Sequence, residues 1–147
     1  MTKRLYLPTL AELIDRMSIV QMKQIFISQN AEQYEIEIKN IMHDINELLI
    51  NKEPNNELIF NAKCIRASLI IQLANRVIWE NESKARLGGS DQDKLLKFTH
   101  SINGIRNTAK NIISKEMGER VDLKIDSLAA DLPTEYGNWN IFTGWEQ

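Results

Sequence analysis

The polar side chains best placed to do chemistry gather between residues 75 and 86. They are Asn75, Arg76, Trp79, Glu80, Glu82, Lys84 and Arg86. Arg76 and Glu80 are four residues apart, so they can form an ion pair along one face of a helix. Polar groups beside a buried stretch can line a ligand pocket, or they can mark where a buried helix reaches the surface. Both interpretations stay open on the sequence.

A second candidate site consists of carboxylates with metal-ligand spacing. Glu12 and Asp15 are three residues apart and would share one helix face. Such a pair can bind Mg²⁺ when a second pair faces it, as in all-α nucleotide pyrophosphohydrolases of the MazG type. By spacing, the second pair could be Glu32 with Glu35, or Asp44 with Glu47. The tandem EExxE motif of that family is absent, and Glu12 also has a capping role.

The other reactive side chains show no catalytic pattern. His43 and Glu47 are four residues apart, but no Cys/His cluster or HExxH motif accompanies them. Cys64 has no basic setting and fits a small core residue. There is no GxGxxG, P-loop or GxSxG motif. We therefore assign no catalytic residue, expect no metal and no cofactor, and favour a role other than that of an enzyme.

Composition and charge predict one ordinary globular domain. The chain has 147 residues, of which 43% are hydrophobic and 26% charged, with a net charge of −2. Charges of both signs are spread along it, which argues against nucleic-acid binding. One cysteine cannot form an internal disulfide, and no signal-peptide core or membrane-spanning stretch occurs. We expect a cytoplasmic protein that binds neither nucleic acid nor membrane.

A seam of apolar residues organises the first third of the chain. It recurs at alternating spacings of three and four from Leu10 to Leu48, without an intervening Gly or Pro. Thr9 and Glu12 form a capping box at its start. One helix to about Asn51 would be roughly 60 Å long, whereas a compact domain of this size is about 40 Å across. This length favours a continuous helix whose seam another subunit buries. A break near residues 28–30 is the alternative.

Two further long helices follow a proline-containing loop. One is predicted from about Asn56 to Arg86, and its apolar residues on more than one face mark it as the most buried helix. The other runs from about Asp91 to Met117 and is capped by Gly118. A short helix is predicted for residues 121–132.

The last residues form an aromatic tail, 134–147, after a helical bundle that spans residues 1–133. Its rings recur every third residue and would share one side of an extended strand. They are Tyr136, Trp139, Phe142 and Trp145. The tail either packs on the bundle as a strap or binds a partner, since aromatic residues anchor interfaces.

The segment TLAELIDRMSIVQMKQIF, Thr9 to Phe26, resembles the opening of an uncharacterised family of small all-helical bacterial proteins with an ELIDRLSI-like phrase. Residues 73–87 and 101–116 are also similar to that family, which brings the resemblance to about a third of the chain. It implies an all-helical fold and no established reaction. It also implies that a shared site or a register-fixing polar network involves Asp15, Arg16, Ser18, Asn75, Trp79, Glu80, Asn103 and Arg106.

The sequence thus predicts an all-α antiparallel bundle of three to four long helices, with a short C-terminal helix and an irregular aromatic tail. The first functional hypothesis is a non-enzymatic interaction or assembly protein that forms a homodimer or binds a protein partner. The second is a small-molecule-binding or transferase-accessory bundle, and the third is the Mg²⁺-dependent pyrophosphohydrolase. Candidate ligand-binding or network residues are Asp15, Arg16, Asn75, Arg76, Trp79, Glu80 and Arg106.

Overall fold

A computed structural model of the chain describes residues 3–52, 60–89, 92–122, 137–142 and 145. Within these ranges the protein is an all-α helical bundle without strands. Its four helices are α1 (Leu10–Phe26), α2 (Ala31–Lys52), α3 (Ala62–Arg86) and α4 (Gln92–Glu116). No described helix is both long enough and apolar enough to cross a bilayer.

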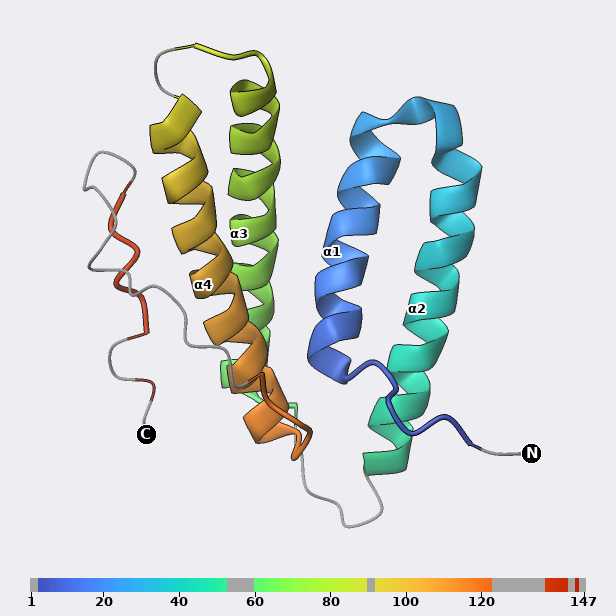
Figure 1. Ribbon diagram of the computed structural model, residues 1–147. Helices are drawn as coiled ribbons and strands as arrows, with labels where there is room; N and C mark the ends of the chain where they lie inside the picture. Colours follow the sequence, from blue (N-terminus) through green and yellow to red (C-terminus); the bar gives the residue numbers. More distant parts are fainter. Residues whose placement is uncertain (1–2, 53–59, 90–91, 123–136, 143–144, 146–147) are drawn as a thin grey trace.

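The helices form two antiparallel hairpins that lie side by side (Figure 1). In the first hairpin α1 packs along α2, and in the second α3 packs along α4. The hairpins meet through α1, which contacts both α3 and α4. Among the described residues, the backbone of α2 comes close to neither α3 nor α4. This arrangement makes α1 the inner helix of the pair that it forms with α2.

The predicted capping box at the start of α1 is confirmed. The backbone N–H of Glu12 donates to Thr9 Oγ1 at 3.2 Å, and the backbone N–H of Thr9 donates to Glu12 Oε2 at 3.3 Å. The N–H of Leu10, at the first turn of α1, has no acceptor within the helix. It donates to Glu119 Oε1, far along the chain, at 3.0 Å. The negative carboxylate also suits the positive end of the helix.

The favoured prediction of one continuous helix from Thr9 to Asn51 is wrong. Ile27 leaves the helix with φ −123° and ψ 89°, and a 3-10 turn at Ser28–Asn30 joins α1 to α2. The alternative break near residues 28–30 is therefore the correct one. An antiparallel hairpin lets the two halves of the seam cover each other, so the seam does not require a second subunit. Leu10 and Val20 are both buried within the single chain, Leu10 in the core cluster that it shares with α3 and α4.

The start of α3 lies later than predicted. Phe60 and Asn61 are not helical, and residues 53–59 lie outside the described part of the chain. Asn61 is the N-cap, and its Oδ1 accepts from the backbone N–H of Cys64 at 3.1 Å. Its Nδ2 donates to Glu116 Oε2 at 2.7 Å, which ties the start of α3 to the end of α4.

The end of α4 agrees with the sequence. Gly118 has a φ of +67°, a conformation that favours glycine. The N–H of Glu119 donates to the carbonyl of Ser114 at 2.8 Å, and that of Gly118 to the carbonyl of Lys115 at 3.2 Å, which is a Schellman motif. Residues 121 and 122 are not helical, and the rest of the short helix predicted for 121–132 lies outside the described residues.

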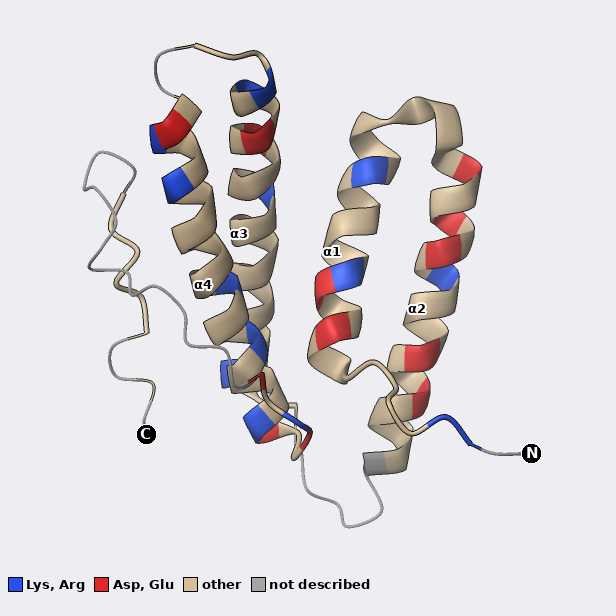
Figure 2. Ribbon diagram, in the orientation of Figure 1, with Lys and Arg blue, Asp and Glu red and all other residues tan. Residues whose placement is uncertain are grey.

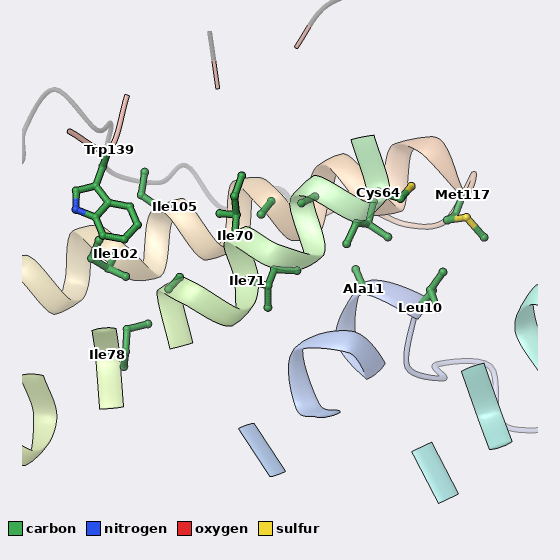
Figure 3. Packing of buried hydrophobic residues seen from close by; sticks show 14 of the residues in the cluster. Leu10, Ala11, Cys64, Ile70, Ile71, Ile78, Ile102, Ile105, Met117 and Trp139 are labelled. Carbon is green, nitrogen blue, oxygen red and sulfur yellow. The ribbon is translucent and has the colours of Figure 1, made fainter. Parts of the chain in front are cut away.

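The hydrophobic core lies mainly between α3 and α4, and the start of α1 closes one end of it (Figure 3). Ile71, Ile102 and Ile113 are fully buried there. Trp139 belongs to the same cluster, and Figure 3 shows its indole beside Ile102. The aromatic tail therefore contributes a ring to the core of the bundle.

Candidate functional site

A buried polar network joins α1, α3 and α4. At its centre is Asn75 on α3, whose side chain is among the buried polar groups of the chain. Its Nδ2 donates to Asp15 Oδ1 at 2.8 Å and to Ser18 Oγ at 3.1 Å, both on α1. Its Oδ1 accepts from Arg106 Nη1 of α4 at 2.8 Å. Both hydrogens and the oxygen of the amide are thus used, which satisfies it in the interior.

The charge of Asp15 is matched from α4. Lys110 Nζ lies 3.5 Å from Asp15 Oδ2, and the two side chains are only 23% and 14% exposed. Lys110 is one helical turn beyond Arg106, so α4 places two cations on the same side of the network. Because every member contacts another helix, the network links α1, α3 and α4.

The structure divides the predicted site residues into separate groups. Asp15, Asn75 and Arg106 meet in the network, whereas Arg16 lies outside it and forms an ion pair with Glu37 of α2 at 2.7 Å. Acidic residues recur along α2 (Figure 2), and Glu37 is one of them. Sequence reasoning missed Lys110, although its spacing of four from Arg106 was a usable signal.

The second group lies near the surface, at the end of α1 and along α3. The predicted ion pair between Arg76 and Glu80 is confirmed, with a separation of 2.9 Å. The guanidinium of Arg76 also lies 4.4 Å from the centre of the Phe26 ring. Phe26 and Trp79 have ring centres 6.4 Å apart in a tilted arrangement. These contacts hold the indole of Trp79 against the outer end of α1.

A pocket of about 450 Å³ opens beside the network, between α1, α3 and α4. Asn75 and Arg106 line it together with Trp79, so it touches both groups of predicted residues. Asn103, one of the positions implied by the family resemblance, also lines it. The pocket joins the helices that the small-molecule hypothesis requires.

The carboxylate pairs considered for Mg²⁺ do not converge in the described part of the chain, which contains no group of three His, Cys, Asp or Glu side chains able to hold a metal ion. Three of these carboxylates instead contact neighbouring basic side chains. Glu12 forms an ion pair with Arg120 at 3.2 Å and Glu35 forms one with Lys39 at 3.1 Å, while Asp44 Oδ1 lies at hydrogen-bond distance from His43 Nδ1, 3.2 Å away. The described residues thus lack the facing carboxylates that the pyrophosphohydrolase hypothesis needs.

Cys64 is a fully buried member of the core, as its setting in the sequence predicted. Burial raises the pKa of the Cys64 thiol, and the nearby carboxylate of Glu116 raises it further against the opposing hydrogen bond with Asn61. The thiol is therefore held neutral and away from solvent, which is the opposite of the setting of a reactive cysteine.

We expect Cys64 of the folded protein to react with maleimide at pH 8 at least about 30-fold more slowly than in urea, a factor that corresponds to an opening free energy of about 2 kcal/mol. The rate is measured by mass spectrometry. Equal labelling rates in buffer and in urea would contradict the buried placement.

The pKa of the Cys64 thiol is higher in the folded than in the unfolded protein. The neutral thiol therefore stabilises the fold below the unfolded pKa of about 8.5, and this stabilisation is lost as the pH rises above that value.

The outward face of α3 carries large aliphatic side chains. Ile65, Leu69 and Leu73 are 54%, 66% and 53% exposed. They are spaced by four residues and form a stripe opposite the buried face of the helix. Among the described helices α3 does have the most buried residues, as predicted, but the residues of this stripe are exposed. The bundle covers one apolar face of α3 and leaves the other in solvent.

The described part of the tail packs on the bundle next to this stripe. The rings of Phe142 and Trp145 lie 5.8 Å apart, and the guanidinium of Arg66 lies 4.6 Å from the Trp145 ring. Arg66 Nη2 also donates to the carbonyl of Ile141 at 3.3 Å. Trp139 is buried in the core cluster, and Phe142 and Trp145 are partly buried against the same cluster. Tyr136 lies outside the described residues.

No known family model matches the chain, and no curated protein or solved structure is significantly similar to it. The resemblance of residues 9–26 to the small helical bacterial proteins therefore stays an expectation. Function has to be inferred from the geometry.

Proposed function

We propose that the protein is a non-enzymatic assembly protein that pairs with a second copy of itself through the outward face of α3. The observation that carries this proposal is the exposure of Ile65, Leu69 and Leu73 on one 25-residue helix. Apolar area removed from water stabilises an association by about 25 cal/mol per Å². Contiguous exposed aliphatic residues of this kind are typical of interaction surfaces.

The spacing of the stripe favours a second copy as the partner. Leu69 lies midway between Ile65 and Leu73, so a two-fold axis through Leu69 makes the stripe complementary to itself. Two antiparallel copies of α3 then place Ile65 of one copy against Leu73 of the other. Closed symmetric pairs of this kind are the commonest assemblies of soluble proteins.

The aromatic tail extends the same surface. Arg66 is the neighbour of Ile65 and lies one turn before Leu69. Its guanidinium contacts the face of the Trp145 ring. Trp145 and Phe142 are only partly buried against the bundle. Half-exposed aromatic rings beside an aliphatic stripe supply the anchors that interfaces favour. This arrangement supports a dimer interface formed by the apolar face of α3 together with the tail.

Leu69→Asp should abolish the pairing. The wild-type chain is expected to be a dimer at low micromolar concentration, whereas the substitution sets two carboxylates against each other across the axis and raises the dissociation constant at least about 100-fold. The mass is measured by light scattering after size-exclusion chromatography. The matched control is Leu96→Asp on α4, where the leucine is 50% exposed and lies off the stripe. A monomeric wild type, or equal masses for the two variants, would refute the proposal.

A further inference from the structure

Three cations line the pocket between α1, α3 and α4, and they have no acidic partner among the described residues. Lys23, Arg86 and Arg106 come from these three helices in turn. Within the described ranges none of the three has a carboxylate at ion-pair distance, whereas Arg76, on α3, is paired. The acidic lining residue, Glu82, is exposed. The lining therefore has an excess of positive charge, which suits an anion.

Arg106 is held ready to bind an oxyanion. Its Nη1 donates to Asn75 Oδ1, and Asn75 is itself held by Asp15 and Ser18. A guanidinium has five N–H donors, and this contact uses one of them. The remaining donors form a planar fork that matches a carboxylate or a phosphate. Because the amide network fixes the guanidinium, binding an anion costs little conformational entropy.

Four apolar side chains also line the pocket, beside the polar Asn75, Ser83 and Asn103. Ile19 and Met22 come from α1, and Ile78 and Trp79 come from α3. Trp79 is partly exposed, and its contact with Phe26 fixes the indole. An indole face favours a flat ring stacked on it or meeting it by an edge. A pocket of about 450 Å³ is also within the size range of small-molecule sites.

We propose that this pocket binds a small organic oxyanion, a phosphate or carboxylate attached to a planar ring, with the oxyanion on Arg106 and the ring against Trp79. Lys23 and Arg86 add charge at the sides of the site. The site lies away from the outward stripe of α3, so this proposal stands independently of self-association. Phosphate and carboxylate share the chemistry that Arg106 recognises, and titration distinguishes them.

The test is isothermal titration calorimetry with adenosine monophosphate, indole-3-acetate and inorganic phosphate. At least one ring-bearing anion is expected to bind with a dissociation constant below about 1 mM. Inorganic phosphate should bind at least about 10-fold more weakly, because it leaves the apolar wall unused. Binding of the nucleotide alone assigns the phosphate source, and binding of indole-3-acetate alone assigns the carboxylate source.

Variants place the binding in the pocket. Arg106→Gln should abolish binding, but Arg106 also belongs to the network, so Arg86→Gln tests the charge at an exposed position. We expect Arg86→Gln to weaken binding about 10-fold, and Trp79→Ala to weaken the ring-bearing anion more than inorganic phosphate. Lys84→Gln is the control, because Lys84 is exposed on α3 and does not line the pocket. The proposal fails if neither ring-bearing anion binds at millimolar concentration, if inorganic phosphate binds as tightly, or if Arg86→Gln binds like Lys84→Gln.

Discussion

Asn75→Leu is expected to lower the free energy of unfolding by about 3 kcal/mol, although leucine matches asparagine in size. The substitution removes the acceptor of Arg106, which is partly buried, and a donor to Asp15, whose side chain is only 14% exposed. A charged group that loses its buried partner bears most of its desolvation cost alone, which makes such changes more destabilising than the loss of a neutral hydrogen bond. Urea unfolding followed by circular dichroism at 222 nm measures the change.

A control for this substitution is available on α4. Asn103 is a partly buried asparagine that lines the same pocket, and no hydrogen bond of its side chain is found among the described residues. Asn103→Leu should therefore change the free energy of unfolding by less than about 1 kcal/mol. If Asn75→Leu destabilises the protein no more than Asn103→Leu, the network does not fix the packing of the helices.

Trp139→Ala is expected to lower the free energy of unfolding by about 3 kcal/mol, in the range for removing a large aromatic side chain from a core. The indole is 9% exposed and lies against residues of α4, so its loss opens a cavity that the bundle cannot fill. Trp139→Phe keeps a ring at this position and should retain most of the stability. The measurement is again urea unfolding. A loss below about 1 kcal/mol for the alanine variant would mean that the tail adds little to the core.

Local features of the fold could be predicted because a few neighbouring residues determine them. The capping box at Thr9 and the Schellman motif at Gly118 each depend on residues within one helical turn or two. The length of the first helix could not be predicted in this way. A seam of period 3.5 is satisfied equally by a partner subunit and by the same chain folded back, and only the turn at Ile27 decides between them.

The prediction of where α3 starts was wrong for a related reason. Asn56 and Asn61 are both good N-caps by residue type, and propensity does not choose between two asparagines five residues apart. Tertiary structure makes the choice, because Asn61 also binds Glu116 at the end of α4. An interaction between residues 55 positions apart leaves no local pattern in the sequence.

The candidate site was predicted only in part. Asp15, Asn75 and Arg106 were named from their positions in segments similar to a helical family, and they do meet in space. Arg16 was named from the same segment as Asp15, yet consecutive helical residues point about 100° apart and Arg16 pairs with Glu37 of α2 instead. Which helix faces which cannot be read from one sequence, so the division of the predicted residues into two groups became visible only in three dimensions.

The contacts of Glu119 and Arg120 with the start of α1 also constrain the order of folding. They join residues 109 and 108 positions apart, so nearly the whole chain must be synthesised before they can form. During translation α1 and α2 emerge first, and Thr9 and Glu12 can satisfy two donors of α1 with no help from later residues. The capping box can thus form as soon as α1 has been synthesised. The late contact closes a loop over most of the chain, a step whose entropic cost places it near the end of folding.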